Sequence, residues 1–218
     1  MFEVPSPVSG DNGFRLLSAP RSGQILQELL EPIWTQGVTG GDVTNGSPNV
    51  WTFNDAVEGD WTAVTDLTTE TVAAGQGILV YVFADTDYSG GDGTLPVTLS
   101  VGSSGTANVD DVTLSGIGDG EWVLAGNPYA IPLDWDELSK SGLSSSIHVY
   151  DHGTTWRAWN GATGELTGGV IAPYQGFFIR GSVGGGSVTF SQRAEAGSAG
   201  TFYKQGASQG AGQEEGSA

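Results

Sequence analysis

Oxygen-bearing side chains alternate along one short stretch of the chain, in the order typical of a calcium-binding loop. The stretch reads Asp-x-Asp-x-Ser-Gly-x-Asp over residues 85–92. Alternate oxygen ligands around a glycine at the sixth position direct carboxylates toward one ion. The twelfth position, which usually supplies a bidentate glutamate, is Pro96, so a site here would bind calcium modestly. A solvated acidic hairpin loop explains the same residues, and we favour it. The candidate Ca²⁺ ligands are Asp85, Asp87, Ser89 and Asp92.

Aromatic and polar residues in the second half of the chain give another candidate, a site that holds a sugar ring. Aromatic rings exposed side by side form a stacking platform, and neighbouring polar groups fix the orientation of the ligand. The alternative, which we favour, is that the same rings cap the ends of a small β core. The candidate ligand-binding residues are Trp159, Tyr129 and Tyr174, with Asn127, Arg157 and His152 beside them.

Other residues that could do chemistry have simpler explanations. His148 and His152 have the spacing of metal ligands only on a helix, and His148 falls in an expected strand. Asp134, Asp136 and Glu137 suit the first turn of a short helix, where carboxylates accept hydrogen bonds from free amides. The chain has neither a Gly-Lys-Ser/Thr phosphate loop nor a Gly-x-Ser-x-Gly elbow. We therefore expect no enzymatic activity.

The composition restricts the classes of partner. Seven lysines and arginines stand against 25 aspartates and glutamates, which gives a formal net charge of -18. Such a surface repels nucleic acid and anionic lipid. The chain has no cysteine, which excludes disulfides and thiolate sites. No apolar run reaches the ~18 residues of a membrane span, and residues 1–7 lack the basic start of a signal peptide. We expect a mature or excised piece of an exported protein.

A tandem duplication organises most of the chain. Residues 72–80 read Val-Ala-Ala-Gly-Gln-Gly-Ile-Leu-Val, and residues 171–179 read Ile-Ala-Pro-Tyr-Gln-Gly-Phe-Phe-Ile. In each copy Gln-Gly precedes an apolar run that predicts a buried strand. Glycine suits a bulge or tight entry there, and glutamine can bond the exposed backbone groups. Five further segments match in the same order: 14–20 with 122–128, 28–29 with 137–138, 50–54 with 147–151, 61–63 with 156–158, and 97–100 with 188–191.

These elements predict an all-β protein made of two homologous, antiparallel, sandwich-like repeats packed together. Short helices are expected at residues 24–30 and 133–138. Whether each repeat closes its own core or the pair builds one is left open. The expected organisation is a lead-in at 1–12, repeats at 13–116 and 117–193, and a Gly/Ser/Gln-rich tail or linker at 194–218.

Aromatic residues that the two copies share are interpreted as core. Trp61 matches Trp156, and Phe14 matches Trp122. A residue type kept at one strand position in both copies is most simply explained by packing. On this interpretation the unmatched aromatics are the ones that remain available for contact with a ligand.

The second copy also resembles a known repeat. The resemblance rests on Trp122, Gly-Asn-Pro-Tyr at 126–129, Leu-Asp-Trp at 133–135, Ile-His-Val-Tyr-Asp at 147–151 and Ile-Ala-Pro-Tyr-Gln-Gly-Phe-Phe at 171–178. This part of the chain is similar to a β repeat of large secreted proteins of the Bacteroidetes group, which commonly stands just before a type IX secretion sorting domain. The resemblance covers most of residues 120–191, and residues 13–101 match more loosely.

The resemblance implies a non-catalytic module of a secreted or cell-surface protein, with a structural or adhesive role. Its partners would be neighbouring domains or subunits of a surface protein or filament. The alternative function is a carbohydrate-binding module that uses exposed tryptophan and tyrosine rings to hold glycans. A glycoside hydrolase is a distant third, because it needs two facing carboxylates and no pair stands out among the acids.

Overall fold

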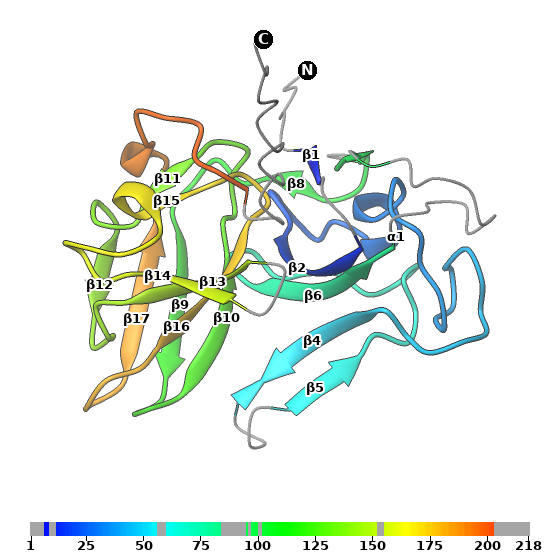
Figure 1. Cartoon of the computed structure of the whole chain (residues 1–218), viewed down its shortest axis with the longest axis horizontal. Coiled ribbons are helices and arrows are strands. Elements are labelled where there is room, and N and C mark those ends of the chain that lie inside the picture. Colours follow the sequence, from blue (N-terminus) through cyan, green and yellow to red (C-terminus); the bar gives the residue numbers. More distant parts are fainter. Residues whose placement is uncertain are drawn as a thin grey trace, which may run out of the picture.

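The computed structural model describes residues 7–8, 12–55, 60–83, 95, 97–99, 102–151 and 155–202. The described chain is mostly antiparallel strands, as the sequence predicts (Figure 1). One four-stranded sheet belongs to each repeat, and the two sheets have the same strand order. In the first repeat the order is β2 (Gly13–Ser18), β6 (Gly77–Val82), β4 (Val50–Asn54), β5 (Asp60–Ala63), and in the second it is β10 (Trp122–Gly126), β16 (Gly176–Arg180), β13 (Ile147–Asp151), β14 (Thr155–Trp159).

Equivalent registers confirm the tandem duplication. The pairing of β2 with β6 ends at Ser18 opposite Gly77, and the pairing of β10 with β16 ends at Gly126 opposite Gly176. The two Gln-Gly pairs therefore stand at equivalent strand entrances. Gln175 is buried there, and its side-chain amide donates to the backbone carbonyls of Leu16 at 3.1 Å and Gly176 at 2.7 Å. A buried amide that bonds backbone oxygens is the role expected of this glutamine.

Smaller sheets complete each repeat. They are formed by β1 (Pro7–Val8) with β7 (Val97–Thr98), β3 (Arg21–Ser22) with β8 (Thr106–Ala107), β11 (Leu133–Asp134) with β15 (Val170–Ile171), and β12 (Ser139–Ser141) with β17 (Gly186–Phe190) and β9 (Val112–Ile117).

The repeats begin and end at other residues than the sequence suggested. Strand β1 pairs with β7 of the first repeat, and β9 pairs with β17 of the second repeat. Since β7 and β17 are matched segments, β1 and β9 are equivalent strands that each precede the rest of their repeat. The expected lead-in at 1–12 therefore includes a strand of the first repeat. The expected boundary at 116 is also wrong, because β9 belongs to the second repeat and the boundary falls between β8 and β9.

The two matched segments expected to be helical differ. The first contains helix α1 (Leu26–Leu29), whose Leu26 and Leu29 are buried. The second is strand β11 followed by a turn, so the expected helix at 133–138 is wrong. Its acids cap that turn instead: the Asp134 carboxylate accepts the Asp136 N–H at 2.9 Å. The described residues also include two short 3-10 helices, η2 (Thr167–Gly169) and η3 (Gln192–Ala194).

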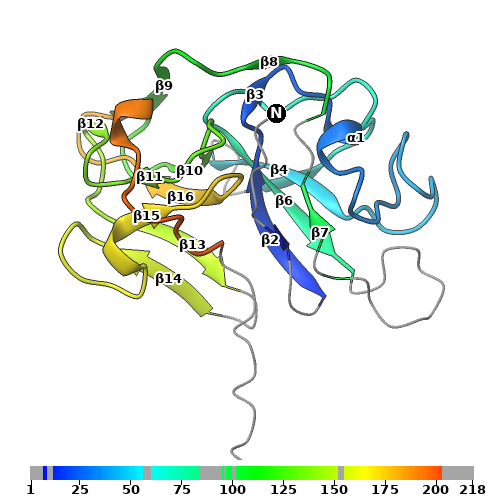
Figure 2. The ribbon, with the colours of Figure 1, turned by 90° about the horizontal axis from the view of Figure 1, so that it is seen from above.

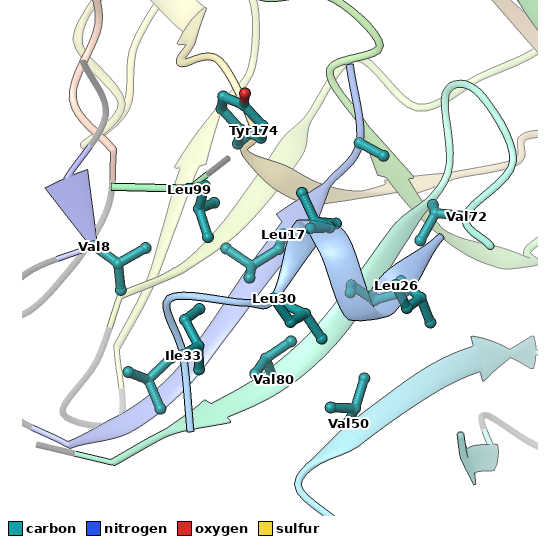
Figure 3. Close-up of a cluster of buried hydrophobic side chains, with 14 of the residues drawn as sticks. Val8, Leu17, Leu26, Leu30, Ile33, Val50, Val72, Val80, Leu99 and Tyr174 are labelled. Carbon is teal, nitrogen blue, oxygen red and sulfur yellow. The ribbon is translucent and has the colours of Figure 1, made fainter. Parts of the chain in front are cut away.

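Each repeat has its own core, which answers the question the sequence left open. The first core lies between the β2-β6-β4-β5 sheet and α1 with its neighbouring loops, and Figure 3 shows its apolar side chains. The second lies between the β10-β16-β13-β14 sheet and the β12-β17-β9 sheet. The expected tail starts too early, because Phe202 is buried in the first core. Strand β1 lies at the end of the molecule opposite β4 and β5 (Figure 1).

Reciprocal backbone contacts join the two repeats around a pseudo-twofold axis. The N–H of Ser18 donates to the carbonyl of Tyr174 at 2.9 Å, and the N–H of Gly126 donates to the carbonyl of Gly75 at 2.8 Å. Ser18 is equivalent to Gly126, and Tyr174 to Gly75, so the second bond is the symmetry image of the first. Figures 1 and 2 show β2 beside the second repeat, where it contacts β13 and β16.

Tyr174 links the two cores. Its ring packs in the first core although the residue belongs to the second repeat (Figure 3). Its φ of 60° lies in the left-handed region, where the equivalent Gly75 has a φ of 82°. A non-glycine residue held in this region is strained. The burial of a large aromatic ring across the interface offsets that strain.

Candidate binding cleft between the repeats

Each four-stranded sheet packs one face against the core of its own repeat. The other faces of the two sheets are directed toward each other. In β16, Phe177 and Ile179 face the second core, whereas Phe178 faces away from it. In β2, Leu17 faces the first core, whereas Leu16 lies on the other face and packs in one cluster with Phe178. Alternate side chains of a strand point to opposite faces. The space between the repeats is therefore lined by the side chains that the two cores leave out.

Aromatic rings from both repeats surround a pocket of about 490 Å³ in this space. Phe178 lies centrally, and four rings stand at steep angles to it: Phe53 at 4.9 Å and 88°, Trp61 at 6.1 Å and 90°, Trp122 at 6.3 Å and 81°, and Trp156 at 5.6 Å and 70°. The distances join ring centroids. We call this pocket the aromatic box. Among the described residues it is lined by Phe53, Trp61, Trp122, His148, Trp156 and Phe178.

A second, smaller pocket lies at the position that the pseudo-twofold axis relates to the aromatic box. It measures about 190 Å³ and shares Trp61 and Trp156 with the aromatic box. Phe14, Leu79 and Tyr150 line it in the positions equivalent to Trp122, Phe178 and Phe53. This pocket is smaller because the ring of Phe14 packs against two further rings on this side. Its centroid lies 5.8 Å from that of Trp51 and 5.0 Å from that of Tyr81. Together the two pockets form one cleft with Trp61 and Trp156 at its centre.

The lining of the aromatic box is uncharged at neutral pH. Burial lowers the pKa of His148 below its ordinary value, so its imidazole is neutral there. This ring packs against Trp122 with centroids 5.3 Å apart. None of the six lining side chains carries a carboxylate, an amide or a hydroxyl group.

Charged groups of both signs adjoin the box. The Asp55 carboxylate accepts the backbone N–H of Trp122 at 2.6 Å. The guanidinium of Arg180 lies 5.6 Å from the ring centroid of Trp122, and Arg180 is not among the lining residues. These two charges offset each other, and the chain as a whole has a formal net charge of -18.

The shared aromatics were interpreted wrongly as core. Trp61 is 37% exposed and Trp156 is 49% exposed, and Phe14 is exposed as well. They lie on matched strands, but on the faces that border the cleft. The duplication has kept these rings at equivalent positions because the same cleft is built from both copies, and not because either core needs them.

The expected sugar platform does not form. Tyr129 is 2% exposed and Tyr174 is 1% exposed. The hydroxyl of Tyr129 donates toward the backbone carbonyls of Asp110 and Phe190, both at 2.9 Å. Asn127 is fully buried, and its side-chain nitrogen donates to the carbonyls of Ile131 at 2.8 Å and Ala172 at 3.1 Å. These side chains are buried and bond backbone carbonyls of the loops, so they have the structural role that the favoured alternative gives them.

The remaining platform residues lie on β14, on the face opposite Trp156. The indole N–H of Trp159 donates to the carboxylate of Asp136 at 3.0 Å. The guanidinium of Arg157 pairs with Asp151 at 2.6 Å. Trp159 packs at the edge of the second core, so it does not share a surface with the aromatic box. His152 lies outside the described residues.

The candidate calcium ligands Asp85, Asp87, Ser89 and Asp92 also lie outside the described residues. Within the described ranges, no group of three histidine, aspartate or glutamate side chains has the arrangement of a metal site. The calcium interpretation stays a prediction of the sequence.

The buried tyrosines predict a loss of stability in alkali. Burial raises the pKa of Tyr129 and of Tyr174 to about 12. An unfolded tyrosine ionises near pH 10, so between about pH 10 and 12 the unfolded chain releases protons that the folded chain retains. Stability is then full below pH 10 and falls as the pH rises toward 12.

Absorbance at 295 nm measures this ionisation. Of the six tyrosines, Tyr129 and Tyr174 should ionise only as the protein unfolds. Tyr174→Phe should raise the pH of unfolding and should cost little stability, since the Tyr174 hydroxyl is buried without a hydrogen-bond partner. Reversible ionisation of all the tyrosines near pH 10 in the folded protein would contradict the burial.

No helix among the described residues combines the length and the apolar character that crossing a membrane requires. Comparisons of the chain with protein-family models, with curated proteins and with solved structures return no match.

Proposed function

We propose that this chain is a non-catalytic β module of an exported or cell-surface protein, with an adhesive or structural role, and that it holds its ligand in the cleft between the repeats. One observation supports this most strongly. Trp61 and Trp156 occupy equivalent strand positions in the two repeats, and they stay 37% and 49% exposed at the centre of one apolar cleft. Concave, mostly apolar surfaces of this kind are where proteins bind ligands.

The chemistry of the cleft favours binding over catalysis. General acid–base work needs a titratable group within hydrogen-bond reach of the substrate, and the box offers only the neutral imidazole of His148. Three carboxylates outside it have lowered pKa values because hydrogen bonds stabilise their charged forms: Ser104 and Ser103 donate to Glu28, Thr68 and Thr69 to Asp66, and the backbone of Ala158 to Glu165. They stabilise loops, and they offer no pair of facing acids of the kind that glycoside hydrolysis uses.

The position of the cleft suits a module that presents its ligand-binding surface at one end. Strand β1 lies at one end of the molecule, and β4 and β5, which supply Phe53 and Trp61, lie at the other end (Figure 1). The resemblance of residues 120–191 to repeats of secreted multidomain proteins agrees with such an arrangement.

Carbohydrate binding is the second candidate, on the observation that the indole groups of Trp61 and Trp156 are exposed. Indole faces stack on the apolar face of a sugar ring. The six side chains of the box, however, provide few partners for sugar hydroxyl groups, and a buried hydroxyl without a partner costs free energy. The cleft therefore suits a less hydroxylated ligand better.

Tryptophan fluorescence tests the proposed function, since three of the seven tryptophans line the aromatic box. The protein is titrated with soluble polysaccharides, apolar peptides and small organic cations. A ligand of the cleft should change the emission and raise the melting temperature by several degrees at saturation.

A variant with both Trp61→Ala and Trp156→Ala should lose at least about tenfold in affinity while it still unfolds cooperatively, because both side chains are exposed. Trp159→Ala, on the opposite face of β14, is the matched control and should bind normally. If the double variant binds every such ligand as tightly as the unmodified protein, the cleft is not the binding site.

A further inference from the structure

We propose that the aromatic box binds an organic cation whose charge is a quaternary ammonium group, of the kind carried by choline. This inference rests on the proposed function, since it names the ligand class of the same cleft. It is argued from the arrangement of the rings, from the groups that the lining omits, and from the charge around the box.

The rings are arranged as a cation-binding site requires. The π face of an aromatic ring carries partial negative charge and its edge partial positive charge. Four rings have centroids 4.9 to 6.3 Å from that of Phe178, and their planes are turned by 70 to 90° from its plane. Rings at steep mutual angles can direct several faces toward one enclosed group. Cages of this kind recognise quaternary ammonium ions, and each contact gains strength when water is excluded.

The lining selects against other cations. A primary ammonium group has three N–H donors and a guanidinium group has five. Within the described lining the only side-chain acceptor is the imidazole of His148, so either group would lose most of its hydrogen bonds on entering the box. For a charged group the loss of these hydrogen bonds opposes binding strongly. A quaternary ammonium ion has no N–H donor and loses none.

The surrounding charge selects for a cation over a neutral group and over an anion. The chain has a formal net charge of -18, and the Asp55 carboxylate accepts the backbone N–H of Trp122 beside the box. Arg180 is the one cation placed close to a ring of the box among the described residues, and Arg157 on the neighbouring strand is paired with Asp151. A cationic ligand is therefore attracted, and a phosphate group attached to the ligand is repelled. Free choline fits these conditions better than phosphocholine.

Calorimetric titration of the unmodified protein tests the inference with matched ligands. Choline and tetramethylammonium are compared with ethanolamine, which is a primary amine, with 3,3-dimethyl-1-butanol, which is the neutral counterpart of choline, and with phosphocholine. Sodium chloride at about 150 mM screens non-specific attraction of cations to the acidic surface. Choline should bind at least about tenfold more tightly than the other three compounds, and tetramethylammonium should bind like choline.

Variants distinguish the contribution of the aromatic ring faces to choline binding from the contribution of apolar contact. Trp61→Leu and Trp156→Leu keep an apolar side chain but remove the π face, and each should weaken choline binding about tenfold. Trp159→Leu is the control and should not change it.

Two results would overturn the inference while leaving the cleft as the binding site: binding of 3,3-dimethyl-1-butanol within about twofold of choline, or equal affinity for choline in the leucine variants. If choline produces no heat or fluorescence change but polysaccharides or apolar peptides still bind through Trp61 and Trp156, the ligand class is wrong and the proposed function stands. Failure of every ligand overturns both.

Discussion

Gly126→Ala should destabilise the protein by about 2 to 4 kcal/mol, because the backbones of the two repeats touch at this residue. An added Cβ would lie 2.6 Å from the carbonyl oxygen of Gln76 and closer still to the side chain of Ser18. The backbone can relieve such an overlap only by shifting, and overpacking of this kind costs about 1 to 3 kcal/mol of stability or more. The backbone of Gly126 is not in the left-handed region, so the cost comes from the contact between repeats.

Urea unfolding measures this loss, with Gly197→Ala as the matched control. A Cβ at Gly197 meets no atom within 4 Å, so the control should change the free energy of unfolding by less than about 0.5 kcal/mol. The Gly126→Ala variant should also lose ligand affinity, since the cleft depends on the same interface. Equal stability of the two variants would show that the repeats do not approach each other as described.

Asn127→Asp should be the most destabilising of the substitutions considered, at about 3 to 5 kcal/mol near neutral pH. The Asn127 amide is fully buried, and it both donates to backbone carbonyls and accepts the N–H of Tyr129 at 3.0 Å. An aspartate would place a carboxylate against those carbonyl oxygens and leave its charge buried and unpaired. The penalty should shrink as the pH falls, because a protonated acid removes the charge.

Asn160→Asp is the control for this substitution. Asn160 lies in an exposed hairpin turn, where its side-chain oxygen accepts the N–H groups of Ala162 and Thr163 at 3.0 and 2.8 Å. A carboxylate accepts the same bonds, so the free energy of unfolding should change by less than about 0.5 kcal/mol. A mild effect of Asn127→Asp, together with weaker ligand binding, would instead return Asn127 to the ligand-binding residues that the sequence suggested.

The sequence predicted the architecture well because apolar periodicity and turn residues act locally. The all-β class, the equivalence of the two halves and the role of Gln175 all follow from such local patterns. The helix at 133–138 was wrong because tertiary pairing of Leu133 with Ile171 outweighs a weak helical pattern. The boundary at 116 was wrong because the partner of β9, β17, lies some 70 residues later, a pairing that no local pattern indicates.

The binding site was harder to predict, since the identity of a residue does not say which face of a sheet is free. The duplication located Trp61 and Trp156 correctly but gave no sign that both face a second sheet. Two features could have indicated it. Each tryptophan stands among polar residues of an outer strand, and the β6 and β16 segments are apolar on both faces, as strands covered on both sides are. Tyr174 and Tyr129 looked free only because their counterparts in the first copy differ.

The indole N–H signals of the protein give the most direct test of the claim that the ligand lies between the repeats. The seven tryptophans should give seven signals in a two-dimensional ¹⁵N–¹H spectrum, assigned by single substitutions. On addition of choline, the signals of Trp61, Trp122 and Trp156 should shift together with one binding curve, while those of Trp135 and Trp159 stay in place. Shifts confined to Trp135 and Trp159, or saturation that leaves Trp61 and Trp156 unmoved, would contradict the account.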